Sequence, residues 1–229
     1  MARVSQEHLD ARRRQILDGA ARCFARNGFH ATSMQDVLGE VGLSAGAVYR
    51  YFRGKDDLIA AIAGEAFAGI RLAFVEASKS TPPPTPDVLL GGVLRLFLAE
   101  RIPGADRQAF ARLIIQVWTE TLRNEELAKT LSEGYDGMRA AWGELVVAYR
   151  ASGLLRADVP VDHVARTLIA TAQGFIAQQA LFGDVSFDIL EDGLRGLMSM
   201  SLPADGAADG AADGAGGRAV GPDSSEPVR

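Results

Sequence analysis

The sequence predicts an all-α protein in which a small N-terminal group of helices precedes a larger helical bundle. Apolar residues recur at the helical spacing i, i+3, i+4 and i+7 along almost the whole chain. No segment shows the alternation of apolar and polar residues that a half-buried strand requires. Glycine, asparagine and proline stand where one helical pattern stops and the next begins.

The first predicted helix covers residues 6–27 and ends at Asn27-Gly28, a common C-terminal stop. Its apolar face carries Leu9, Ile16, Ala20 and Phe24. Three consecutive arginines, at 12 to 14, begin off that face. We therefore expect a helix that buries one side and exposes a basic one.

The next two helices are short and are joined by a tight turn. Ser33 and Asp36 form a capping-box-like pair, so the second helix is expected to begin at this point. Gly42 supplies the turn, and Ser44 is a natural N-cap for a third helix over 45–51. This pair of helices has the form of a helix-turn-helix.

A longer fourth helix is predicted from residue 55 to residue 78, with Asp56 and Asp57 placed favourably against its dipole. At ~1.5 Å per residue it is roughly 35 Å long, enough to leave one domain and enter another. The proline-rich segment 80–86 then forms a stiff, non-helical linker. Further helices are expected at 87–101, 107–123, 125–152, 161–182 and 187–202.

Composition favours a soluble globular protein, because 48% of the residues are hydrophobic and 23% are charged. No run approaches ~18 consecutive apolar residues, so no membrane span is expected. The N-terminal MARVSQEHLDARRR lacks the apolar core of a signal peptide. We therefore expect a cytoplasmic protein without a membrane partner. The lone Cys23 agrees with a reducing compartment.

The net charge of −5 is spread unevenly along the chain. Residues 1–55 hold nine basic and five acidic residues and so carry +4, which leaves −9 on the rest. A positive N-terminal segment on a negative body fits a protein that binds DNA through one end. Chance asymmetry on a solvated surface is the alternative that charge alone leaves open.

Residues that would support an enzyme are not brought together by the sequence. His8, His30 and His163 are scattered, and no His/Glu pair has metal-ligand spacing on one helix face. There is no glycine-rich phosphate loop and no nucleophile elbow. We therefore expect no enzymatic activity, no metal and no cofactor.

The third helix is the candidate for contact with DNA. Residues 44–47 carry almost no side chain, so the helix backbone could sit deep in a major groove, with its N-terminus near phosphates. Ala45 and Ala47 could contact thymine methyls. Phosphates would be contacted by Thr32, Ser33, Tyr49, Tyr51 and Lys55. Taken singly, each of these residues has an ordinary alternative role as a helix cap or a packing residue.

The whole N-terminal string resembles the TetR/AcrR family of transcriptional regulators over about residues 10–60. The matching positions are Gly28, Phe29, Thr32-Ser33-Met34, Asp36-Val37, Gly42-Leu43-Ser44, Gly46, Val48-Tyr49, Tyr51-Phe52 and Lys55. One departure, Val41-Gly42-Leu43 where the family often has Ala-Gly-Val, is a conservative core change. The resemblance implies that Ala45, Gly46 and Ala47 face base edges, with Arg50 as a further contact, and that Ser44 joins the residues that position phosphates. It also implies a homodimer that binds a palindromic double-stranded operator and usually represses.

The resemblance also implies the domain organisation. Residues 1–55 form the three-helix helix-turn-helix DNA-binding domain, and residues 56–202 form a helical-bundle ligand-binding and dimerisation domain. Residues 203–229, which repeat Ala-Asp-Gly, lack the apolar mass to offset ordering entropy and are expected to be a disordered tail. A flexible arm could carry Arg3 into the minor groove, with a plain solvated end as the alternative.

Aromatic and apolar stripes in the helices at 107–123 and 125–152 suggest a pocket for a small-molecule effector of unknown identity. Its predicted walls are Phe110, Ile114, Trp118, Tyr135, Met138 and Trp142. Its predicted polar groups are Gln116, Glu120 and Gln173. Ordinary core packing is the alternative interpretation of these stripes.

The last two helices are the predicted dimer surface. A strip of small residues comprises Ala170, Gly174 and Ala177, and an apolar strip comprises Leu190, Leu194 and Leu197. Two such helices from each chain would form a two-fold four-helix bundle. The alternative is that both strips are buried within one subunit.

These observations predict a sequence-specific transcriptional regulator, a repressor released from its operator by a small apolar or amphiphilic effector. The alternative is a DNA-binding activator or architectural regulator that needs no effector. The two differ in whether a ligand weakens DNA binding.

Overall fold

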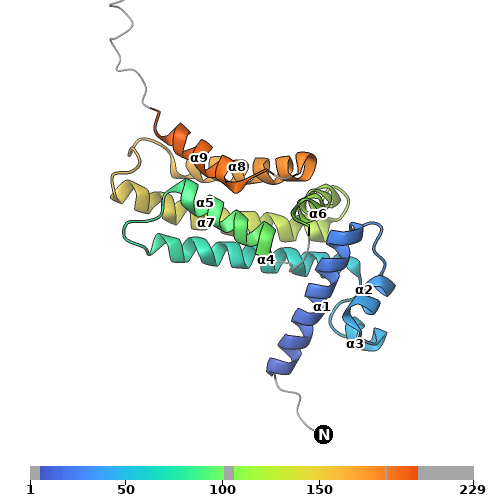
Figure 1. The fold of residues 1–229 in the computed structure, drawn as a ribbon. Coiled ribbons are helices and arrows are strands. Elements are labelled where there is room, and N and C mark those ends of the chain that lie inside the picture. Colours follow the sequence, from blue (N-terminus) through green and yellow to red (C-terminus); the bar gives the residue numbers. More distant parts are fainter. Residues whose placement is uncertain (1–5, 101–105, 184, 201–229) are drawn as a thin grey trace, which may run out of the picture.

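The computed structural model describes residues 6–100, 106–183 and 185–200, and every regular element in these ranges is helical. Figure 1 shows a small head, made of α1, α2 and α3, below a bundle in which α4, α5, α7, α8 and α9 run side by side. The expected arm at Arg3 and the expected tail 203–229 lie outside the described residues. The all-α prediction is confirmed.

The head contains α1 (Gln6–Asn27), α2 (Met34–Val41) and α3 (Ala45–Tyr49), close to the predicted positions. The third helix ends two residues earlier than predicted, because the amides of Tyr51 and Phe52 both donate to the carbonyl of Val48 and close a turn there. Val48 and Phe52 are buried against α1 and its neighbours. Burial of these two side chains holds a helix too short to be stable alone.

α4 (Lys55–Ser78) begins at the head and continues into the bundle. By length and composition alone it is apolar enough to cross a membrane, which the search for long apolar runs did not predict. In the fold it packs chiefly against α7, and also against α1 and α5. Its apolar side chains therefore have protein neighbours along much of its length.

The bundle is completed by α5 (Pro86–Arg95), α6 (Arg107–Glu120), α7 (Glu125–Ala151), α8 (Val161–Phe182) and α9 (Phe187–Met198). α6 crosses the other helices and is seen nearly end-on beside the top of α1 in Figure 1. The first residues of these five helices agree with the sequence prediction to within one residue.

The ends of the bundle helices differ more from prediction. The helix predicted over 87–101 changes to a π-helical turn at Leu96–Glu100. α6 stops at Glu120 because the next residues form a turn, which ends at Asn124, the N-cap of α7. The Asn124 side chain accepts a hydrogen bond from the Leu127 amide at 3.0 Å. α9 ends at Met198, not at residue 202.

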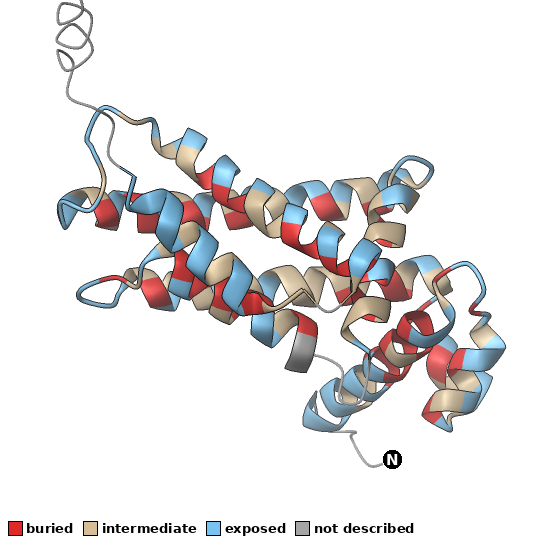
Figure 2. Ribbon diagram, turned by 45° about the horizontal axis from the view of Figure 1, so that its top comes forward, coloured by how far each residue is buried: buried red, intermediate tan, exposed pale blue. Residues whose placement is uncertain are grey.

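One continuous core links the head to the bundle. Ile16, Ala20 and Phe24 of α1 are wholly buried, as are Leu58 of α4 and Leu145 of α7. Figure 2 shows the buried positions running along the inward faces of the helices, with exposed positions on the outside. The head is therefore packed onto the bundle through apolar contacts and does not hang from a linker.

α9 is fastened to α5 by ion pairs as well as by apolar packing. Asp87, only 2% exposed at the start of α5, accepts a hydrogen bond from Arg195 Nε at 3.0 Å. Arg95 of α5 donates to Glu191 of α9 at 3.0 Å, which is a second bond between these two helices. Burial raises the pKa of Asp87, but hydrogen bonds from Thr85 and the Val88 amide and the charge of Arg195 outweigh it, so the pKa lies below its ordinary value.

We predict that Asp87→Asn lowers the free energy of unfolding by about 1–3 kcal/mol at pH 7, because it removes a buried charged acceptor. Since the folded-state pKa lies below the unfolded one, the carboxylate stabilises the fold above about pH 4 and loses this effect as the pH falls further. Urea denaturation at pH 7 and near pH 3 measures the difference between wild type and variant. An undiminished difference at the lower pH would contradict the assignment.

Candidate nucleic-acid interface and interior cavity

The start of α2 is held by the capping box that the sequence predicts. The Asp36 amide donates to Ser33 Oγ at 3.2 Å, and the Ser33 amide donates to Asp36 Oδ2 at 2.8 Å. Hydrogen bonds from the Ser33 hydroxyl and amide hold the pKa of Asp36 below its ordinary value. On the other face, Glu40 accepts from Arg22 at 2.8 Å and from Arg26 at 3.1 Å. α2 is therefore capped at its start and tied to α1 near its end.

The turn between α2 and α3 uses a left-handed residue. Gly42 has φ of 65° and its amide donates to the Leu38 carbonyl at 3.1 Å, which closes α2. A side chain at this φ would be strained, which explains the glycine. Ser44 then caps α3 by accepting from the Ala47 amide at 3.3 Å. The two helices are thus set at a defined angle by local signals.

α3 presents its outer surface to solvent. Ser44, Ala45, Gly46 and Arg50 are exposed, and the Tyr49 side chain is 47% exposed. Ala47 and Tyr51 are half-buried. An exposed surface of small residues flanked by a tyrosine and an arginine, on a helix braced from behind, has the form needed to enter a groove.

Three predicted phosphate contacts are engaged within the protein. Thr32 is only 1% exposed, and its hydroxyl donates to the carbonyls of Gly28 at 2.8 Å and Cys23 at 3.3 Å. The exposed Ser33 hydroxyl donates to Asp36 at 2.7 Å. The prediction for the Thr32 hydroxyl is therefore wrong, since a buried donor with two acceptors cannot reach a phosphate. Ser33 would first have to give up its bond to the neighbouring carboxylate.

The ammonium of Lys55, predicted to contact a phosphate, already has acceptors within the protein. Its ammonium donates to the carbonyl of Phe29 at 2.9 Å and to that of His30 at 3.4 Å. It also lies 4.7 Å from the centre of the Phe29 ring, a cation–π distance. Lys55 therefore holds the turn between α1 and α2 in place, a role its position in the sequence does not reveal.

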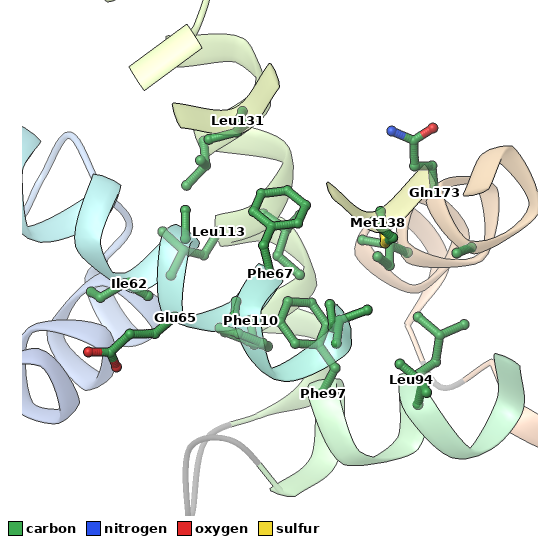
Figure 3. Close-up of a pocket in the computed structure, with 18 of the residues that line it drawn as sticks. Ile62, Glu65, Phe67, Leu94, Phe97, Phe110, Leu113, Leu131, Met138 and Gln173 are labelled. Atoms are coloured by element: carbon green, nitrogen blue, oxygen red, sulfur yellow. The ribbon is translucent and has the colours of Figure 1, made fainter. Parts of the chain in front are cut away.

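A cavity of about 430 Å³ lies between the bundle helices and α1. Figure 3 shows Ile62 and Glu65 at the end of the cavity nearest α1, with Met138 and Gln173 at the opposite end. Leu17 and Ala21 of α1 also line it. The cavity is therefore shared between the head and the bundle, and its size is that of a small-molecule site.

Aromatic rings stand in a cavity wall that is otherwise mainly aliphatic. Phe67 lies 5.0 Å from Tyr135, centre to centre, and Phe74 lies 4.4 Å from Trp142. Burial raises the pKa of Tyr135, whereas hydrogen bonding with Gln173 and Trp118 acts to lower it. The deep part of the cavity is thus apolar, with one small hydrogen-bonding group, a chemistry suited to an uncharged ligand.

Seven of the nine predicted pocket residues line this cavity. They are Phe110, Ile114, Trp118, Tyr135, Met138, Trp142 and Gln173. The other two are corrected, because Gln116 and Glu120 turn toward the α1–α2 turn. Gln116 accepts a hydrogen bond from the Phe29 amide, and Glu120 lies 3.4 Å from His30 Nε2.

Sequence analysis missed the contribution of α4 and of the π-helical turn to the cavity. The unpredicted lining residues of these elements are Ile59, Ile62, Ala63, Glu65, Ala66, Phe67, Ile70, Phe74 and Phe97. A signal was present, since 62, 66, 70 and 74 repeat at a spacing of four residues. It could not distinguish a cavity wall from ordinary core.

The predicted dimer strips divide into an exposed part and a packed part. Ala170 and Gly174 are exposed on α8, and Ala177 is half-buried. On α9 Leu197 is 67% exposed, whereas Leu190 and Leu194 pack against the core of their own subunit. The dimer contact predicted for Leu190 and Leu194 stays a prediction, because both side chains are only partly buried in the single chain. Exposed apolar residues that were not predicted lie beside the strip: Leu181, Phe182, Ile189 and Met200.

Comparison with known proteins gives two family matches. Residues 16–62 match "Bacterial regulatory proteins, tetR family", and residues 92–211 match "BetI-type transcriptional repressor, C-terminal". The second match alone covers more than half of the chain. The first coincides with the head and the start of α4, and the second with most of the bundle.

Individual relatives extend this similarity over most of the chain. The HTH-type transcriptional repressor Rv1474c of Mycobacterium tuberculosis is 29% identical over 200 residues, which are 85% of this chain and 99% of the relative. The structure of Salmonella enterica GusR matches with a TM-score of 0.65 at 28% identity, covering 87% and 100% of the two chains. That of Bacillus subtilis FadR, in complex with stearoyl-CoA, has the same TM-score at 18% identity, covering 81% and 96%. The last likeness concerns the fold.

We predict that the wild-type chain binds Nile red, an uncharged lipophilic dye, with a saturable rise in fluorescence. Ala66 lines the cavity, so Ala66→Phe should weaken this binding at least about tenfold by filling the space. Ala68 is exposed on the same helix and is the matched control, because Ala68→Phe should bind the dye as wild type does. Equal binding by both variants would place the dye elsewhere.

Proposed function

The chain belongs to the TetR family of bacterial transcriptional regulators, and on this basis we propose that it is a repressor whose dimer leaves a palindromic operator when an uncharged, lipophilic effector fills the interior cavity. DNA binding through the helix-turn-helix and regulation of transcription are properties of the family, which is not an enzyme family. The operator, the dimer and the effector class are the parts proposed here.

The observation that carries the proposal is the exposed outer surface of α3. Ala45, Gly46 and Ala47 have no bulk to keep the helix backbone from the bases, and a thymine methyl could contact either alanine. Tyr49 and Arg50 stand at the end of the same helix, where they could reach phosphates or a base edge. Because these contacts are made with DNA, we propose that the protein acts in the cytoplasm.

A dimer would supply the two reading helices that a palindrome needs. The exposed part of α8, together with Leu197 and its apolar neighbours on α9, supports a two-fold contact in which equal surfaces meet. Small residues at 170 and 174 would let the two copies of α8 approach closely. The reading helices would then lie about one turn of DNA apart, roughly 34 Å.

The cavity supports an uncharged effector. Arg22 is the one cation among the lining residues that the structure describes, and its guanidinium already pairs with Glu40 at 2.8 Å. Glu65 at the α1 end is paired with Arg13. FadR of Bacillus subtilis is a structural relative that binds stearoyl-CoA. The described walls here offer an acyl chain a suitable surface but provide no cluster of cations for nucleotide phosphates.

An effector regulates DNA binding only if it has different affinities for the DNA-bound and free conformations. The cavity is walled by α1 as well as by the bundle, so a molecule inside it touches the head directly. This shared wall favours an effector-controlled regulator over the alternative of an architectural protein without an effector.

The direct test is fluorescence anisotropy of the purified protein with the DNA upstream of its own coding sequence, at two salt concentrations and with excess random duplex. Saturable binding that survives the competitor supports an operator-specific regulator. Compounds that displace the protein in the same assay would identify the effector. Complete absence of binding at low salt would contradict the proposed function.

Arg50 is exposed at the end of α3, and we assign it here to a phosphate in place of the predicted base edge. We therefore predict that Arg50→Ala lowers the slope of log Kd against log salt by about one, because that phosphate contact is lost. Lys55→Ala is the matched control, since the Lys55 ammonium is held by two carbonyls. It should leave the slope unchanged while lowering the melting temperature. A fall in slope for Lys55→Ala equal to that for Arg50→Ala would restore Lys55 as a phosphate contact.

We predict that Leu197→Asp converts the dimer to a monomer of 24.3 kDa, because two aspartates would replace an apolar contact at the two-fold axis. Leu154, 57% exposed in the loop after α7, provides the control, and Leu154→Asp should remain dimeric. Sedimentation equilibrium distinguishes the two masses. If Leu197→Asp sedimented as a dimer, the α8–α9 surface would not be the interface.

A further inference from the structure

The turn between α1 and α2 is held by side chains from two of the helices that wall the cavity, α4 and α6. From α6, Gln116 Oε1 accepts a hydrogen bond from the Phe29 amide at 2.8 Å, although the two residues are 87 positions apart in the sequence. From α4, the ammonium of Lys55 donates to the Phe29 carbonyl at 2.9 Å. The backbone N–H and C=O of Phe29 are therefore both held by side chains from outside α1, α2 and α3.

The Phe29 side chain is an anchor in the same place. It is 3% exposed, and its ring centre lies 5.4 Å from that of Phe24 in the core of α1. Gly28, with φ of 83°, lets the chain pass so close to α6 that an added Cβ would lie 3.2 Å from the Gln116 amide. The turn can hardly shift against α6 without breaking the bond to Gln116.

The adjoining face of α6 forms part of the cavity wall. Leu113, Ile114, Val117 and Trp118 line the cavity, and Gln116 lies among them in the sequence. A ligand that displaced this rigid helix would therefore displace the Gln116 amide as well. Hydrogen bonds weaken steeply with distance and angle, so a small displacement suffices to break one.

The other end of the turn between α1 and α2 leads directly into α2, the first helix of the helix-turn-helix. The buried Thr32 hydroxyl donates to the Gly28 carbonyl at 2.8 Å, and Ser33 caps α2. Glu120 adds a second contact from α6, with its carboxylate 3.4 Å from His30 Nε2 and 2.9 Å from Arg123. A movement of α6 thus reaches the start of the helix-turn-helix within a few residues.

We propose that Gln116 is the positioning residue through which filling of the cavity alters the head: the bond to the Phe29 amide is made when the cavity is empty and broken when it is filled. This inference rests on the proposed function, because it assigns the route by which the effector would act. The two alternatives, bond made and bond broken, are the discrete states that such control requires.

The experiment measures hydrogen exchange of the Phe29 amide by NMR on the full chain. Gln116→Met, which keeps the length but removes the acceptor, should speed this exchange about fivefold or more. Gln116→Glu keeps an acceptor oxygen and should restore protection close to wild type. Any general loosening of the fold would also speed the exchange of core amides such as those of Leu145 and Val146, which provide an internal reference.

The cavity is filled from within by Ala66→Phe, with Ala68→Phe as the matched control and Ala172→Phe as a second filling variant. Filling should speed exchange at Phe29 in the wild-type background, and the control should not. In the Gln116→Met background filling should add nothing, because the bond is already absent.

Unchanged protection of Phe29 in Gln116→Met would overturn the proposal, since the bond would then not restrain the turn. So would folded filling variants that leave exchange at Phe29 as it is in Ala68→Phe, or that speed it equally in both Gln116 backgrounds. The exchange measurement needs neither DNA nor an effector. A failure of wild type to bind its upstream DNA would therefore defeat the proposed function and leave this result to be judged separately.

Discussion

The packing of α1 between the small helices and the bundle is the constraint on which the rest of the structure depends. Ile16, Ala20 and Phe24 are wholly buried on this one helix. α3 is too short to be stable by itself and is held by Val48 and Phe52 packing into the same core. Because the core is continuous, α1 cannot change its position without affecting both the surface that faces DNA and the wall of the cavity.

The cavity has a cost to stability that its position explains. Unfilled space in a core loses dispersion contacts and lowers stability, and well-packed bundles of this size have no need of it. Here the space is bordered by rings from α4, α6 and α7, among them Phe67, Trp118 and Trp142. A cavity kept open by stiff aromatic side chains, with few polar groups and a wall shared with α1, is what ligand-controlled binding would require.

The polar residues where the head meets the bundle have roles that differ from those their residue types suggest. Gln116 and Glu120 lie on a helix rich in apolar residues, where polar groups suggest ligand contact, yet both face the α1–α2 turn. Lys55 stands beside a helix-turn-helix, where a cation suggests phosphate, yet it satisfies two carbonyls. Gln116 and Lys55 satisfy backbone groups of this turn, which require partners, whereas Glu120 pairs with the side chains of His30 and Arg123.

The sequence by itself determined the helices, the turn and the exposed reading surface, because their signals are local: Ser33 with Asp36, Gly42, and Ser44 each act within four residues of their own positions. It also identified the part of the cavity wall that α6 and α7 provide, because helical spacing places Ile114 with Trp118 and Met138 with Trp142 on shared faces. Only the tertiary structure decided which way Gln116, Glu120 and Leu194 face. The rotation of a helix about its own axis is set by packing against residues that are distant in the sequence, and spacing along one helix does not contain that information.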